Sequence, residues 1–185
     1  MKWWLFDVLR KRLPKKQTLA ITAAAEHLTA IMAEALFQRK EVMGEADPRM
    51  FAMYAWHAME EMEHKAVAFD VMQKVAKVWY PRRVMALLQT TLSFNINVLA
   101  FANAMLRQDG FTRWQRFKLF AKGLGWVYGP GGMFTGTWRS YVRYFKPGFH
   151  RWQEPPTPVY ALWLDTFNRT GDPVEAGRVV YAAAT

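Results

Sequence analysis

The chain has 185 residues, of which 52% are hydrophobic and 16% aromatic, so it is long and apolar enough for one domain with a sizeable core. This composition excludes a disordered chain, and the absence of cysteine excludes disulfide frameworks, thiolate zinc sites and a cysteine nucleophile. The formal net charge of +10 leaves nucleic acid, a membrane surface or acidic substrates as partners. Because the cations are scattered among aromatic residues and form no nucleic-acid-binding motif, nucleic acid is the least favoured.

Residues 1–13 are short, basic and amphipathic, and they lack the long apolar stretch and cleavage site of a signal peptide. Two alternatives remain for them, a helix lying on a membrane surface and a plain docking helix. The lack of cysteine fits a cytoplasmic protein, and association with a membrane is a further alternative suggested by the cationic, aromatic composition.

Apolar spacing predicts a helix over about 15–44, in which Glu26 is the only carboxylate of an otherwise apolar row. The row consists of Leu19, Ala23, Glu26, Ala30, Ala33 and Phe37. A short turn at 44–48 predicts that the next helix runs antiparallel, which brings Glu26 near the middle of that helix. Taken alone, Glu26 is explained equally well by an ion pair with a neighbouring Lys or Arg.

The next helix is predicted over about 48–79, beginning with Asp47 as N-cap and Pro48 at the first helical position. No Gly or Pro interrupts residues 50–77, so we expect one continuous helix. At about 100° per residue, two histidines and two glutamates share one arc with Met50, Met53, Ala68 and Val71. These four are His57, Glu60, Glu61 and His64. The arc is expected to face the core, and Glu63, Asp70, Lys74 and Lys77 are expected to face solvent.

Carboxylates in a core require a partner or a metal ion. The spacing of Glu61 and His64 is the Glu-x-x-His spacing of di-iron carboxylate bundles. Without cysteine, a metal must be held by oxygen and imidazole, which favours iron, manganese or zinc. The alternative is a helix whose polar side is merely solvated or ion-paired.

A helix over about 82–108 contains no charged residue between Val84 and Leu106, and Arg83 and Arg107 flank that stretch. Its length reaches the transmembrane range, but its Thr, Ser and Asn residues are costly in lipid. A buried bundle helix and a helix in contact with a membrane both remain open.

Further helices are predicted over about 111–127, 132–145 and 159–168, and residues 171–185 are expected to be a weakly ordered tail. The Gly129–Gly132 segment lacks the Lys and Ser/Thr of a phosphate-binding loop. The whole is expected to be an all-α protein with a single helical domain over 1–170.

Three segments carry a family resemblance: AITAAAEHLTAIMAE (20–34), WHAMEEMEHKAVAFDV (56–71) and YFKPGFHRWQ (144–153). Together they resemble the bacterial family of predicted metal-dependent hydrolases, from about residue 13 to 167. The resemblance implies a ferritin-like helical bundle with additional C-terminal helices and a metal site. It also implies site roles for Glu26, His57, Glu60, Glu61 and His64. The third segment adds His150 without a clear role.

Family members usually carry a preceding QExxHxxxH segment, which this sequence lacks. The bundle is therefore expected to be N-terminally truncated, or a second copy completes the site as a homodimer. A single divalent metal ion held by Glu26, Glu61 and His64, with open positions, is also compatible with the chain.

The resemblance suggests a hydrolase acting on an unknown small-molecule substrate. A metal-bound water would supply hydroxide, with Glu60 as general base and His57 as a ligand or proton shuttle. The alternatives are a di-iron oxygen-activating protein and a non-catalytic, membrane-associated helical protein.

Overall fold

The computed structural model describes residues 11–39, 42, 46–64, 66–153 and 158–183. Every regular element in these ranges is helical, which confirms the all-α class. The elements are α2 (Lys15–Gln38), α3 (Pro48–His64), α4 (Val67–Asp70), the π-helix η2 (Val71–Val75), α5 (Tyr80–Gln108), α6 (Arg113–Tyr128), α7 (Trp138–Arg143), the 3₁₀-helix η3 (Arg151–Gln153), α8 (Pro158–Thr170) and α9 (Pro173–Ala183). The amphipathic segment predicted over 1–13 lies largely outside the described residues.

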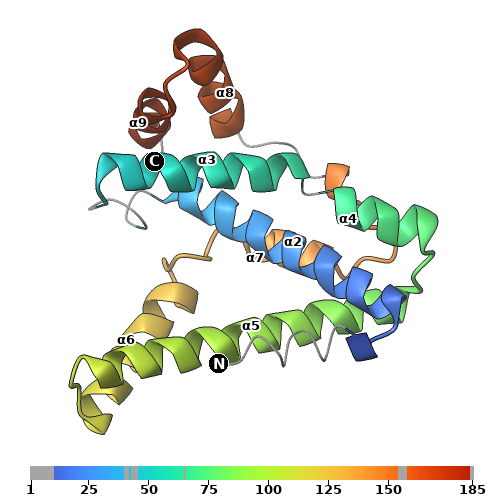
Figure 1. Cartoon of the computed structure of the whole chain (residues 1–185), viewed down its shortest axis with the longest axis horizontal. Helices are drawn as coiled ribbons and strands as arrows, with labels where there is room; N and C mark the ends of the chain where they lie inside the picture. Colours follow the sequence, from blue (N-terminus) through green and yellow to red (C-terminus); the bar gives the residue numbers. More distant parts are fainter. Residues whose placement is uncertain (1–10, 40–41, 43–45, 65, 154–157, 184–185) are drawn as a thin grey trace.

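The central element is α2, which packs against α3 on one side and α5 on the other. Helix α3 returns antiparallel to α2, as predicted, and α8 and α9 cover the far side of α3 (Figure 1). The start of α3 is also as predicted, because the side chain of Asp47 accepts a hydrogen bond of 2.9 Å from the backbone N–H of Arg49.

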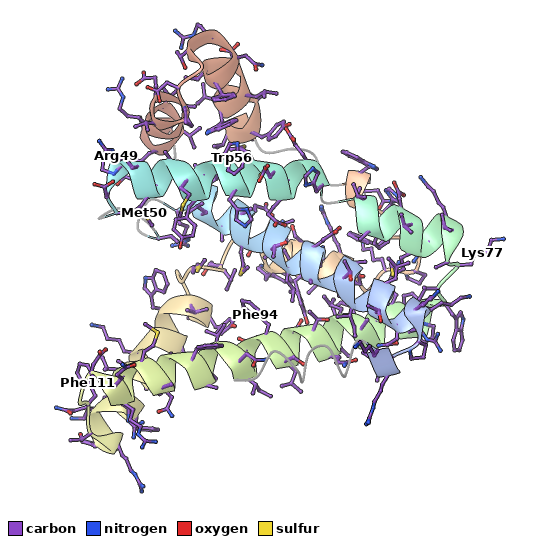
Figure 2. All side chains as sticks on the ribbon, in the orientation of Figure 1. Arg49, Met50, Trp56, Lys77, Phe94 and Phe111 are labelled. Carbon is purple, nitrogen blue, oxygen red and sulfur yellow. The ribbon has the colours of Figure 1, made fainter. Side chains whose placement is uncertain are left out.

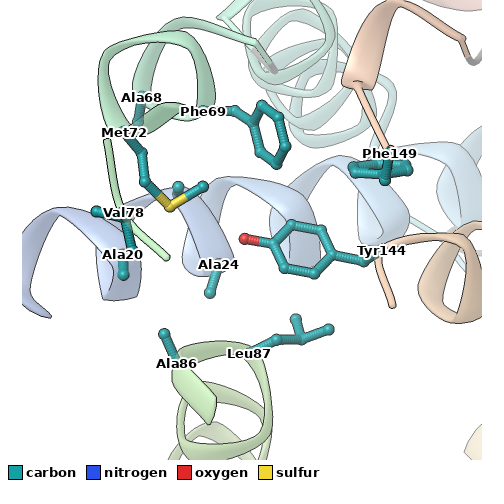
Figure 3. Packing of buried hydrophobic residues seen from close by; sticks show 11 residues of the cluster. Ala20, Ala24, Ala68, Phe69, Met72, Val78, Ala86, Leu87, Tyr144 and Phe149 are labelled. Carbon is teal, nitrogen blue, oxygen red and sulfur yellow. The ribbon is translucent and has the colours of Figure 1, made fainter. Parts of the chain in front are cut away.

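A first core cluster joins the N-terminal half of α2 to η2 and the start of α5. Figure 3 shows the ring of Tyr144 between Phe69 and Phe149 on one side and Leu87 on the other. Alanines of α2 (Ala20, Ala23, Ala24) line it, and their small side chains let these elements approach closely. A C-terminal segment is thus part of the core of the N-terminal helices.

Arg83 is 2% exposed and closes this cluster. Its Nη2 donates hydrogen bonds to the carbonyl oxygens of Tyr144, at 2.9 Å, and Lys146, at 2.6 Å. The guanidinium carbon lies 5.1 Å from the ring centre of Tyr80 and 5.2 Å from that of Tyr144, a cation–π arrangement. Burial lowers the pKa of the Arg83 guanidinium. From the sequence, Arg83 is only a charge that flanks an apolar helix. In the structure, Arg83 connects α5 to residues 144–146.

A second core cluster joins the C-terminal half of α2 to α3, α8 and α9. Its buried residues include Phe37 of α2, Met59 of α3, Trp163 of α8 and Val180 of α9. The prediction of a weakly ordered tail from residue 171 is therefore wrong for the described residues. Pro173–Ala183 is a helix whose Gly177 packs closely on α3.

Three predicted helices are shorter in the structure, and the one expected over about 15–44 ends at Gln38, where Arg39 adopts an extended conformation. The helix expected over 48–79 ends at His64, and a turn at Ala66 precedes α4 and η2. The turn between η2 and α5 places Lys77 at a φ of 47°. The helix expected over 132–145 is reduced to α7, because residues 133–137 form successive turns.

Helix α5 is long and largely uncovered. By length and composition α2 and α5 are both candidates for crossing a membrane, but the apolar window of α2 is 44% buried and that of α5 only 11%. Only Arg83, Ala86 and Leu87 of α5 are buried. The buried-bundle alternative for α5 therefore holds only near its start.

Candidate metal centre

Helix α3 buries a different face from the one predicted. The buried residues of α3 are Phe51, Ala52, Ala55, Ala58, Met59 and Met62, which lie on the opposite side from the His57–His64 arc. Met50 and Met53 of the predicted core arc are 46% and 50% exposed. The reason is that α3 is covered by both α2 and α9, and its small alanines permit that close packing.

Glu61 stands where the His57–His64 arc meets α2. Its Oε2 accepts a hydrogen bond of 2.5 Å from the hydroxyl of Thr29 on α2, and its Oε1 lies 3.7 Å from Nε2 of His57. The side chain of Glu61 is 25% exposed and that of His57 is 61% exposed. The hydrogen bond from Thr29 thus holds Oε2 of Glu61 in place, and Oε1 faces Nε2 of the solvent-exposed His57.

The remaining predicted site residues make other contacts or face solvent. Glu26 is half-buried in its apolar row, and its Oε2 accepts a hydrogen bond of 3.3 Å from the backbone N–H of Ala68, at the start of α4. Glu60 is half-buried and His64 is exposed. The predicted approach of α2 to the middle of α3 is therefore present, with Thr29 making the contact to Glu61.

The donor chemistry fits a divalent metal only in part. Carboxylate oxygen and imidazole nitrogen suit iron, manganese or zinc, and the Glu61 and His57 atoms converge from adjacent turns of one helix. Within the described part of the chain, however, no three His, Asp or Glu side chains gather closely enough to hold an ion. The structure thus presents a pair of donors and not a closed coordination set.

His150, whose role the sequence left open, contacts α4. Its Nε2–H donates a hydrogen bond of 2.8 Å to Oδ1 of Asp70, and its Nδ1 accepts one of 3.3 Å from the backbone N–H of Trp152. Asp70 also pairs with Lys74 at 3.0 Å, and both partners lower the pKa of its carboxyl group, His150 more strongly. His150 therefore anchors the C-terminal loop to the segment that follows the candidate site.

Sequence reasoning missed Thr29 and the Asp70–His150 pair. Thr29 lies one helical turn after Glu26, and its neighbours gave no sign that its hydroxyl would reach across to α3. Asp70 was assigned to the solvent face, and its half-buried position follows from the loop that folds over it.

A family model described as predicted metal-dependent hydrolase matches residues 1–155. The chain belongs to this family. The matched residues include α2, α3 and His150, and the match confirms the resemblance seen in the sequence motifs. The family description implies a metal ion without stating which one. Comparisons with curated proteins and with solved structures gave no match.

Proposed function

We propose that this chain is a metal-dependent hydrolase whose metal ion is first bound by Glu61 and His57. The observation that carries the proposal is the arrangement of the Glu61 carboxylate. Thr29 holds Oε2 at 2.5 Å, which leaves Oε1 directed toward His57 Nε2 at 3.7 Å. Hydrogen bonds of this kind orient metal-binding carboxylates and tune their affinity.

Glu61 and His57 would hold the ion, which would supply a bound water molecule of lowered pKa. Glu60, half-buried on the same turn, is the proposed general base that accepts the proton of that water. His57 is more than half exposed, so beyond its role as a ligand it can pass a proton to solvent. The substrate is an unidentified small molecule with a hydrolysable bond.

Glu26 and His64 are the proposed additional ligands. Glu26 lies on α2 three residues before Thr29, and His64 lies three residues after Glu61 at the exposed end of α3. A second copy of the chain is the proposed source of any further ligands, through twofold pairing of the exposed His57–His64 arc. Iron, manganese and zinc all suit this mixture of oxygen and nitrogen donors.

The test is metal analysis of the purified protein together with its oligomeric state. We expect bound metal in the wild type, and its loss in Glu61→Ala and in His57→Ala with little change in helical content. Glu63→Ala is the matched control, because Glu63 is exposed on α3 and instead accepts a hydrogen bond of 2.8 Å from Tyr160. Full metal content in both site variants would refute the ligand assignment.

A further inference from the structure

Most of α5 and all of α6 form an arm that the rest of the chain covers only in part, near Thr91, which hydrogen-bonds to Tyr141 at 3.1 Å. This α5–α6 arm, residues 88–128, extends away from α3, α8 and α9 (Figure 1). No residue of α6 is buried. Apolar side chains that expose more than half of their surface include Leu92, Ile96, Phe101, Met105, Trp114 and Phe117. An exposed apolar surface on this scale indicates a binding partner.

Hydrogen bonds within the arm hold α5 and α6 in a defined arrangement. Thr112 caps α6 in a capping box with Gln115, whose side chain accepts a hydrogen bond of 2.8 Å from the Thr112 backbone N–H. Arg116 donates a hydrogen bond of 2.8 Å to the side-chain oxygen of Asn103, and the hydroxyl of Tyr128 donates one to the side-chain oxygen of Asn95. These two links fix α6 antiparallel to α5, so the exposed side chains are presented on a defined frame.

The exposed apolar residues of α5 extend too far around the helix for a single protein partner. From Phe101 through Leu92 to Ile96 they cover about 220° of the helix circumference at 100° per residue. A helix that packs on a groove buries a much narrower stripe. Figure 2 shows Phe111 at the end of the arm where α5 meets α6, whereas Phe94 faces α2 and α7 across a cavity that it lines with Leu28 and Tyr141. The acyl chains of a lipid bilayer can cover such a wide apolar surface, whereas the groove of a folded protein covers only part of it.

The positive charge of this part of the chain favours an anionic membrane as the partner. Between residues 80 and 153 the sequence has one acidic residue, Asp109, whereas the arm alone carries Arg107, Arg113, Arg116, Lys118 and Lys122. The ammonium of Lys118 lies 5.3 Å from the ring centre of Trp114, which in turn stacks on Phe117 at 5.4 Å. Aromatic side chains beside long cationic ones are typical of helices at an anionic membrane surface.

We propose that the α5–α6 arm docks on the surface of an anionic lipid bilayer. The apolar side of the arm enters the boundary between headgroups and acyl chains, and the stems of Lys118 and Lys122 extend so that their charges reach the lipid headgroups. The arm lies on the bilayer and does not cross it, because crossing would carry the four cations of α6 into hydrocarbon. This proposal is independent of the metal site.

The experiment is flotation of the full chain with vesicles of phosphatidylcholine, with and without phosphatidylserine. We expect flotation with the anionic vesicles, a decrease with added salt, and a blue shift of tryptophan fluorescence. The double variant Lys118→Ala/Lys122→Ala is expected to bind about 30-fold more weakly. Trp114→Ser/Phe117→Ser is expected to lose both flotation and the blue shift while keeping its helical content.

The matched control is Arg49→Ala/Arg169→Ala, which removes the same charge from exposed positions on α3 and α8 and should bind like the wild type. Equal weakening by this control would mean that net charge alone attracts the protein, which overturns the assignment to the arm. Failure of the protein to float with either kind of vesicle would also overturn the proposal. Dimerisation through the arm, or binding of a nucleic acid to it, would then be the alternative.

Discussion

His150 donates a hydrogen bond of 2.8 Å to Asp70, and this contact joins the last segment of the family match to the element that follows α3. The two residues are 80 positions apart in the chain. Because Nδ1 of His150 accepts a backbone N–H, the hydrogen of the imidazole is directed through Nε2 to the carboxylate. The loop after α7 is thereby fixed over α4.

The Asp70 contact predicts a specific acid sensitivity. His150, and then Lys74, lower the pKa of Asp70 below its ordinary value of 3.8. A carboxyl group with a lowered folded-state pKa stabilises the fold fully above the unfolded pKa, and this contribution is lost as the pH falls below 3.8 through the folded pKa. Asp70→Asn should therefore lower the melting temperature at neutral pH and flatten its decline below pH 3.8. Melting curves over this range, with exposed Asp165→Asn as control, check the prediction; parallel curves for Asp70→Asn and wild type contradict it.

Thr29→Val should weaken metal binding by about 10- to 100-fold, because the substitution keeps the shape of the side chain and removes the hydrogen bond that orients Glu61. The expected loss of stability is only about 1 kcal/mol. Titration calorimetry with Mn²⁺ or Zn²⁺ measures the change. Thr22→Val is the control, since the hydroxyl of Thr22 bonds within α2 to the Thr18 carbonyl at 3.1 Å. Equal affinities for the Thr29 and Thr22 variants would remove Thr29 from the site.

Arg83→Met should lower the free energy of unfolding by about 1–3 kcal/mol, because the carbonyl oxygens of Tyr144 and Lys146 lose their buried donor. Urea unfolding followed by circular dichroism measures this quantity. Arg82→Met, at the exposed neighbouring position, should change it little. An unchanged midpoint for Arg83→Met would mean that methionine packing compensates for the lost donor.

Gly177→Leu should detach α9 from α3. Even a Cβ at this position would lie 3.3 Å from the Cα of Ala52, so a larger side chain forces the helices apart at a cost of about 1–3 kcal/mol. Limited proteolysis should then cleave between α8 and α9 faster than in the wild type. Val174→Leu adds bulk on the exposed first turn of α9 and should leave the cleavage rate unchanged.

The positions of the helices could be predicted from the sequence more fully than their orientations. On α3 the residues near Met53 and those near Met59 both offer an apolar row, and the sequence alone does not decide between them. The choice depends on α9, which comes more than a hundred residues later and covers the alanine-rich face. The inward direction predicted for His57 and His64 failed for this reason, whereas Glu61, at the edge of the buried face, does contact α2.

A usable signal for α9 was present in the sequence. Asp172 and Pro173 repeat the Asp–Pro start that correctly predicted α3, and the Asp172 side chain accepts a hydrogen bond of 2.8 Å from the Val174 N–H. The break between α3 and α4 had no such signal, because no Gly or Pro lies between Met50 and Lys77. There, tertiary packing of Phe69 and Met72 into the first core cluster overrides local helix preference.

Helix α2 supplies Ala20, Ala23 and Ala24 to one core cluster and Ala33 and Phe37 to the other. Unfolding of either cluster would disrupt α2, which the other cluster also requires. We therefore expect the two ends of the molecule to unfold together, and binding of the proposed ion by Glu61 to stabilise both.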